Sequence, residues 1–181
     1  MNKRLITVKS ESNIPVKYLD TAIEKLLKYH NLNFKSEGNE TAELLTVMCM
    51  DNRQMMRLPR NFSFYIRNAG GRVSDVSFSI SFAIAVGGVQ AIAVIGHNDC
   101  RMVGLEAAEE AFRRGLSERG GWEAAEAGLH FSAMCPAYKK DDVIESVISD
   151  VKLLRSGYPN IIVAPLFYNV DDGLLYLVKE S

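Results

Sequence analysis

The chain has 181 residues, of which 48% are apolar and 24% charged, and its formal net charge is −1. A chain of this length can bury one substantial core, so we expect a single domain over residues 1–181. Acidic and basic residues nearly balance and no basic stripe interleaves with aromatic residues, which argues against nucleic acid as a partner.

Neither a membrane span nor a secretory signal is predicted. The longest apolar stretch, FAIAVGGVQAIAVIG (82–96), is interrupted by glycines and Gln90, and is shorter than the roughly 20 residues that a membrane-spanning helix needs. The polar start, MNKRLITVKSESNIP, lacks the apolar region of a signal peptide. Three widely spaced cysteines do not make a disulfide framework, so we expect a cytoplasmic protein whose cysteines are ligands, catalysts or buried apolar groups.

The first predicted element is an amphipathic helix, VKYLDTAIEKLLKY (16–29). Its apolar residues recur at the spacing of one helical face: Val16, Leu19, Ile23, Leu26 and Leu27. We expect it to form an N-terminal helical arm, about residues 14–30. After a polar break, AELLTVMCM (42–50) is a mostly apolar run typical of a buried parallel strand.

The next segments alternate between strand and helix. FSFYIR (62–67) predicts a strand that enters a tight loop, NAGG (68–71). In DVSFSISFAIAVGG (75–88) the apolar residues are too dense for a surface helix, which predicts a largely buried helix that ends at the glycine pair. QAIAVIG (90–96) is then predicted to be the most deeply buried strand.

The last third predicts three helices and a hairpin. MVGLEAAEEAFRRG (102–115) and ERGGWEAAEAGLHFSAMCPAY (118–138) are rich in helix formers, and DDVIESVISDVKLLRSG (141–157) has an acidic first turn and a glycine stop. In NIIVAPLFYNVDDGLLYLV (160–178) two apolar runs flank the hairpin signal DDG. The whole pattern predicts an α/β fold: a mainly parallel central β-sheet flanked by helices, with an antiparallel C-terminal edge strand.

Two predicted strand ends carry residues that bind metals. Cys49 closes LLTVMC, and GHNDC (96–100) follows the strand QAIAVI. Open α/β sheets place their sites at the carboxyl ends of the strands. Cys49, His97 and Cys100 offer two thiolates and an imidazole, which suit zinc, and three protein ligands leave a fourth position open for catalysis. Alone, HNDC is a weak signal, because a cysteine near a strand end is usually packing; its pairing with Cys49 favours a metal.

Asp51 and Arg53 follow Cys49 at alternate positions. In an extended backbone all three side chains point to one side. A bidentate pair with Arg53 would keep Asp51 ionised beside the metal, where the carboxylate can accept a hydrogen bond from a zinc-bound water. The alternative is a solvent-exposed ion pair of little value.

Three motifs in order now suggest a family. CMDNR (49–53), YIRNAGGRV (65–73) and GHNDC (96–100) resemble the β-class carbonic anhydrases, whose pattern is Cys-x-Asp-x-Arg, Arg-Asn-x-x-Gly and His-x-x-Cys. The resemblance runs from about Leu44 to Leu105 and continues more loosely to the last predicted strands.

The resemblance implies a role for each residue of the constellation. Cys49, His97 and Cys100 would bind Zn²⁺, and Asp51 and Arg53 would form the catalytic dyad. In that family the counterpart of Asp51 can also coordinate zinc directly, which gives a closed, inactive state.

The resemblance also implies an activity and an assembly. The expected function is zinc-dependent, reversible hydration of carbon dioxide to bicarbonate and a proton by a zinc-bound hydroxide. Two alternatives stay open: a CS2 or COS hydrolase on the same fold, and a non-catalytic zinc-binding member. Because the leading helix of that family commonly packs on a partner subunit, a homodimer or higher homo-oligomer is expected.

Two residues depart from the family pattern. Arg101 stands where the family usually has glycine, and Asn52 where it usually has serine. Arg101 could narrow the pocket, bind an anion or point to solvent. Outside the motifs, Cys135 is expected to be a structural thiol and His30 an ordinary polar residue.

Overall fold

The computed structural model describes residues 3–180, and its centre is one six-stranded sheet with the strand order β1-β6-β5-β4-β2-β3. The strands are β1 Leu5–Thr7, β2 Leu44–Cys49, β3 Ser63–Asn68, β4 Ala91–His97, β5 Ile162–Asn169 and β6 Leu174–Val178. β3, β2, β4 and β5 are parallel neighbours, β6 pairs antiparallel with β5, and β1 pairs antiparallel with β6. The predicted α/β fold with a mainly parallel sheet is therefore confirmed.

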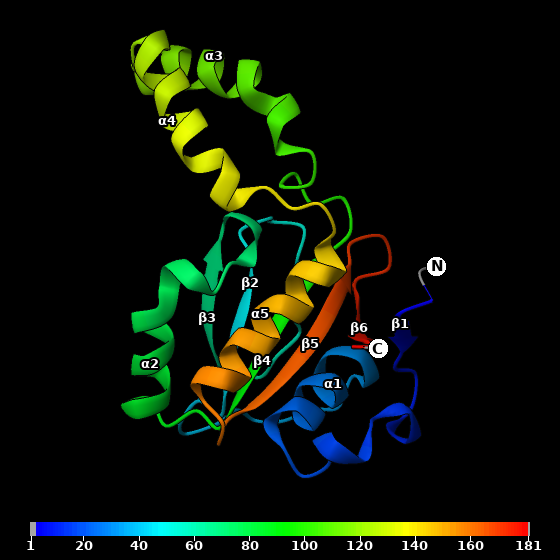
Figure 1. Cartoon of the computed structure of the whole chain (residues 1–181). Coiled ribbons are helices and arrows are strands. Elements are labelled where there is room, and N and C mark those ends of the chain that lie inside the picture. The colour runs from blue at the N-terminus through cyan, green and yellow to red at the C-terminus, as the bar shows by residue number, and fades with distance from the viewer. Residues whose placement is uncertain (1–2, 181) are drawn as a thin grey trace.

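Helices cover both faces of this sheet (Figure 1). The α-helices of residues 3–180 are α1 Ala22–Leu32, α2 Ser77–Ala85, α3 Glu109–Gly120, α4 Ala124–Tyr138 and α5 Val143–Gly157. α1 lies on one face, whereas α2 and α5 lie on the other. α3 and α4 form a hairpin that projects beyond the end of the sheet at which β4 finishes (Figure 1). No helix within residues 3–180 is long and apolar enough to cross a membrane.

The predicted N-terminal helix is shorter than expected. Residues Val16–Tyr18 form a 3-10 turn, and α1 starts only at Ala22. The start is set by Thr21, whose hydroxyl accepts a hydrogen bond from the N–H of Ile23 at 3.2 Å. The sequence Thr-x-x-Glu at residues 21–24 is a known signature of a helix N-terminus.

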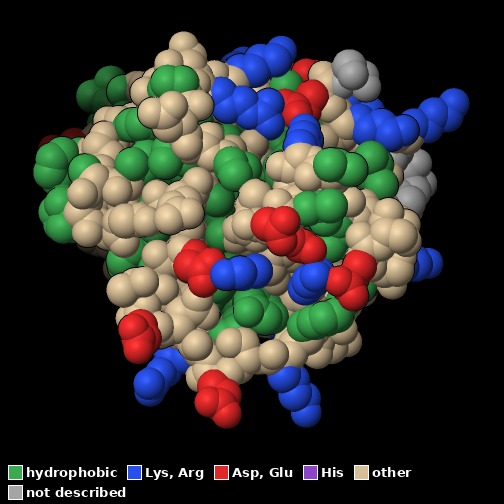
Figure 2. All heavy atoms as spheres, turned by 90° about the horizontal axis from the view of Figure 1, so that it is seen from below, with side chains coloured by type: hydrophobic (Ala, Val, Ile, Leu, Met, Phe, Trp, Pro, Cys, Tyr) green, Lys and Arg blue, Asp and Glu red, His purple; other side chains and the backbone are tan. Residues whose placement is uncertain are grey.

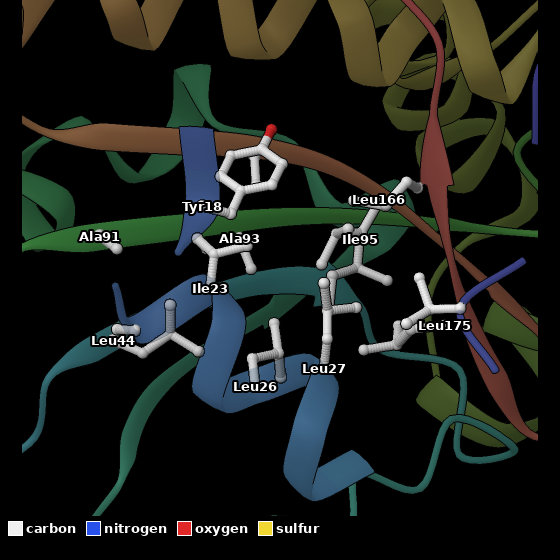
Figure 3. Packing of buried hydrophobic residues seen from close by; sticks show 14 of the residues in the cluster. Tyr18, Ile23, Leu26, Leu27, Leu44, Ala91, Ala93, Ile95, Leu166 and Leu175 are labelled. Atoms are coloured by element: carbon white, nitrogen blue, oxygen red, sulfur yellow. The ribbon is translucent and has the colours of Figure 1, made fainter. Parts of the chain in front are cut away.

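α1 packs against its own sheet. Its residues Ile23, Leu26 and Leu27 are fully buried and point toward the strands, where they meet Leu44, Ala91, Ala93, Ile95 and Leu166 (Figure 3). At roughly 1.5–3 kcal/mol for each buried aliphatic side chain, this contact is a large part of the core on that face. The apolar side of α1 is thus occupied within the chain.

The prediction of a largely buried helix over 75–88 is wrong in part. Only Ile80 and Ala83 of α2 are buried, because only one side of the helix meets the sheet. Phe78, Phe82 and Val86 are 79%, 54% and 68% exposed. The helix has apolar residues on two sides, but only one of these sides packs within the chain.

The other predicted elements differ mainly at their ends. The helix expected from residue 102 begins as a 3-10 turn, Leu105–Ala108, and continues as α3 to Gly120. α4 continues through Pro136 to Tyr138, so the buried Cys135 is helical. α5 and the hairpin of β5 and β6 lie where they were predicted. β1 was not predicted.

His30 differs most from its prediction. It is fully buried, its Nε2 lies 3.0 Å from the carbonyl oxygen of Gly173, and its Nδ1 accepts from the backbone N–H of Arg57 at 3.1 Å. It therefore ties α1 to two loops. Burial lowers the pKa of His30 to about 4, and the nearby Arg57 adds to this effect.

This burial predicts a pH dependence of stability. Unfolded histidine has a pKa of about 6.5, so as pH falls the unfolded chain takes up the proton first, and about 3 kcal/mol of stability should be lost between pH 6.5 and pH 4. In His30→Asn this loss should be missing, so the unfolding free energies of variant and wild type should converge at low pH. Urea denaturation from pH 8 to 4.5 measures both; parallel curves would contradict the assignment. His130→Asn, at an exposed position, controls for loss of a histidine.

Candidate metal centre

The parallel pairing of β2 with β4 brings the predicted ligands together. Cys49 ends β2 and His97 ends β4, and Cys100 follows in the turn after β4. One ligand atom from each residue lies within 4.8 Å of the others, and all three side chains are buried. That these residues bind a metal remains a prediction, but the spacing is that of a shared ion.

The histidine presents a free nitrogen. His97 Nδ1 lies 2.8 Å from the carbonyl oxygen of Asn98, a contact in which Nδ1 carries the proton and donates. Its Nε2 is then an acceptor, and it is buried without a hydrogen-bond partner among the described residues. Buried polar atoms are rarely left unpaired, and a metal-binding histidine commonly donates its other N–H to a carbonyl in this way.

The two thiols share one negative charge readily. The pKa of Cys49 lies well below its usual range, chiefly because it accepts a hydrogen bond from the Cys100 thiol, with further contributions from backbone groups of Asp51 and Gly70. The thiolate on Cys49 in turn raises the pKa of Cys100. Two sulfurs and one imidazole nitrogen form a donor set that suits zinc. The residues present therefore fit a zinc ion.

Asp51 and Arg53 form the predicted pair. Arg53 donates from Nε to Asp51 Oδ1 at 3.0 Å and from Nη2 to Asp51 Oδ2 at 2.7 Å, and its backbone N–H donates to Oδ1 at 2.9 Å. These bonds hold the pKa of Asp51 well below its usual range. The carboxylate is thus ionised and fixed beside Cys49, in the same pocket.

Arg67 on β3 has a role that its sequence motif did not predict. Its Nε donates to the carbonyl oxygen of Cys49 at 3.1 Å, and its Nη2 donates to that of Asp51 at 2.6 Å. Arg67 therefore fixes the backbone that carries one candidate ligand and the dyad. It lies within the Arg-Asn motif that marked the family resemblance, but nothing in the motif indicates the carbonyl groups that it binds.

The glycine pair after β3 lets a loop lie directly on Cys49. A Cβ atom at Gly71 would lie 2.9 Å from the carbonyl carbon of Met48 and 3.0 Å from the nitrogen of Cys49, and the residue has a φ of +67°. Any side chain there would push the loop off the end of β2. The family motif thus has a steric reason.

An open pocket of about 610 Å³ contains the candidate site. It is lined by Cys49, Met50, Asp51, Asn52, Arg53, Ala69, Asp99, Cys100, Arg101 and Met102. Both departures from the family pattern, Asn52 and Arg101, are exposed at this pocket. A second pocket, of about 390 Å³ and mostly apolar, adjoins it and shares Ala69 and Met102.

Comparisons with known proteins agree with the motifs. The family model described as carbonic anhydrase matches residues 44–152. "Putative carbonic anhydrase YvdA" of Bacillus subtilis (strain 168) is 29% identical in an alignment of 149 positions, and the match covers 70% of this chain and 75% of that protein.

Two solved structures show the same fold. The β-carbonic anhydrase isoform I of Trichomonas vaginalis is 19% identical with a TM-score of 0.64, and covers 93% of this chain and 100% of its own. The apo form of a carbon disulfide hydrolase is 22% identical with a TM-score of 0.56, and the match covers 92% of this chain and 93% of that one.

The donor set predicts a difference between two buried cysteines. Cys49→Ser should weaken zinc binding by at least about 100-fold, because a serine hydroxyl stays protonated at neutral pH. This loss should exceed the roughly 10–100-fold loss that follows when a residue hydrogen-bonded to a metal ligand is replaced. Cys135→Ser is the matched control, since Cys135 is also a buried free thiol but lies in α4. Competition with a chromophoric chelator measures both affinities; equal losses would refute the ligand assignment.

Proposed function

The chain belongs to the β-class carbonic anhydrase family, and from this membership and its site we propose that it is a zinc lyase that reversibly hydrates carbon dioxide to bicarbonate and a proton. One observation carries the proposal: the thiols of Cys49 and Cys100 line the same pocket as the carboxylate that Arg53 holds. A metal held by Cys49, His97 and Cys100 would lie beside an ionised, oriented acceptor.

This arrangement suggests a separate role for the metal, for Asp51 and for Arg53. Zinc, when bound, supplies a Lewis acid that lowers the pKa of water to about 7, as in the carbonic anhydrases with three histidine ligands. Asp51 accepts a hydrogen bond from the attacking water and so aims its lone pair at the carbon atom of the substrate. Arg53 keeps Asp51 ionised and in place. The proton leaves through the open mouth of the pocket to water or buffer.

The position of Asp51 supports an open site. Three donors of one residue, Arg53, bind its carboxylate. Coordination of the metal by Asp51 would require the carboxylate to give up bonds that are already well formed. We therefore propose that the fourth position is available to water.

Hydrolysis of CS2 or COS is the second candidate. The adjoining pocket supports it, because its walls include Leu105, Phe112, Phe131 and Met134 and would suit a soft, apolar molecule. A non-catalytic zinc protein is the third, in which Arg101 at the mouth of the pocket would hinder turnover. The three candidates share the metal: the first releases bicarbonate, the second releases sulfide, and the third forms no product.

We propose that the protein acts in the cytoplasm and as a homo-oligomer. All three cysteines are free thiols, which suits a reducing compartment. The outer side of α2 and the edge strand β3 form an apolar surface, with Phe64, Tyr65, Phe78 and Phe82 about half exposed or more. Hydrophobic side chains gather on the left of Figure 2, the side on which α2 lies in Figure 1. Such a surface favours contact with a second copy.

The zinc-loaded protein should hydrate carbon dioxide faster than buffer in a stopped-flow assay between pH 7 and 9. Asp51→Asn and Arg53→Gln should each lower kcat/KM by about 100-fold or more, because they remove the oriented acceptor. Arg60→Gln, at an exposed arginine away from the pocket, should leave the rate unchanged. No turnover of CO2, COS or CS2 with zinc bound would leave the non-catalytic reading; sulfide release without CO2 hydration would favour the second candidate.

The apolar surface predicts the state of assembly. Light scattering should give at least twice the chain mass of 20.1 kDa for the wild type. Phe82→Asp should yield monomers, since it places a charge in the centre of the proposed contact. Leu153→Asp, at a 58% exposed leucine on α5, is the matched control and should keep the wild-type mass. A monomeric wild type would remove the proposed contact.

A further inference from the structure

Arg53 binds two carboxylates rather than one. Besides Asp51, it donates from Nη1 to Asp99 Oδ2 at 2.7 Å and from Nη2 to the backbone oxygen of Asp99 at 3.1 Å. Nε and one N–H of Nη2 bind Asp51, whereas Nη1 and the other N–H of Nη2 bind Asp99. The two aspartates therefore occupy different edges of one guanidinium. The bonds to one aspartate therefore do not compete with those to the other.

Asp99 is held in position by its own loop. It lies in the turn between His97 and Cys100, with a φ of +54° that aspartate tolerates better than most residues. Its neighbour Asn98 accepts from the N–H of Val170 at 2.7 Å and donates to Asp171 Oδ2 at 3.0 Å. The turn after β4 is thus anchored to the turn between β5 and β6, and Asp99 extends from this anchor to Arg53.

We propose that Asp99 is a positioning residue: it fixes the guanidinium of Arg53 so that Asp51 stays oriented toward the pocket. The inference rests on the proposed function. A guanidinium held at one edge can still swing together with its carboxylate, whereas bonds at a second edge, from an independently anchored loop, remove that freedom. Asp99 thereby links the loop of His97 and Cys100 to the dyad.

The simpler reading is an exposed ion pair without consequence. The Asp99 side chain is 75% exposed, and such pairs contribute little to stability. The two readings differ in where a loss would appear. Positioning affects the rate and the mobility of Arg53 but leaves the stability of the fold unchanged, whereas an inconsequential pair affects none of them.

Three variants test the proposal. Asp99→Gly removes the carboxylate at a position whose φ suits glycine, and Asp99→Asn keeps an acceptor oxygen without the charge. Asp20→Gly is the matched control, because Asp20 is likewise an exposed aspartate with a positive φ, +59°, and lies away from the pocket. We expect kcat for CO2 hydration to fall about tenfold in Asp99→Gly and about threefold in Asp99→Asn, with KM little changed, and to stay constant in Asp20→Gly.

A second measurement does not depend on turnover. In the metal-free protein, hydrogen exchange of the Arg53 Nε–H, followed by NMR, should be about tenfold faster in Asp99→Gly and unchanged in Asp20→Gly, at equal urea midpoints. Unchanged exchange in Asp99→Gly, or equal changes in the control, would overturn the proposal. If the wild type does not hydrate CO2, the proposed function fails while the exchange data still decide the role of Asp99. If Asp99→Gly does not fold, Asp99→Asn decides: its exchange rate for the Arg53 Nε–H should lie between those expected for the wild type and for Asp99→Gly.

Discussion

The candidate site depends on the parallel pairing of β2 with β4. Parallel strands end at the same edge of the sheet, so the pairing of Met48 with Ile95 places Cys49 and His97 at neighbouring strand ends. Both strands are completely buried, so a one-residue slip would disturb the packing on both faces of the sheet. The core on the two faces therefore fixes the distance between the candidate ligands before any metal is considered.

The pairing of β2 with β4 also buries the polar groups of Cys49, His97 and Cys100. His97 Nε2 has no hydrogen-bond partner among the described residues, and two thiols in contact favour one negative charge. In the metal-free state the unpaired nitrogen costs stability. A cation bound by all three residues would satisfy the nitrogen and both sulfurs, so metal binding and folding stability should be linked. The groups that weaken the metal-free fold are therefore the ones that a bound metal would satisfy.

What the sequence could predict depended on how local the signal was. The strand ends, and the alternation of Cys49, Asp51 and Arg53, follow from patterns a few residues long, and the fold they indicated is the one observed. The burial of His30 depends on Gly173, 143 positions away, and Asp99 meets Arg53 across 46 positions. β1 has three residues, too few for a pattern. The composition of α2 showed two apolar faces but could not show which one the chain itself would cover.

The bonds of Arg53 bear on whether Asp51 faces water or replaces it at the metal. If Asp51 coordinated a metal, its carboxylate would lose the hydrogen bonds from three donors of Arg53 and gain one coordination bond. Arg53 could not follow, because Asp99 holds it from a loop anchored at Asn98. The guanidinium would then face one carboxylate fewer, and the coordination bond would have to offset the broken charge-assisted hydrogen bonds. A fixed arginine thus favours an ionised Asp51 that would lie close to a bound metal without coordinating it.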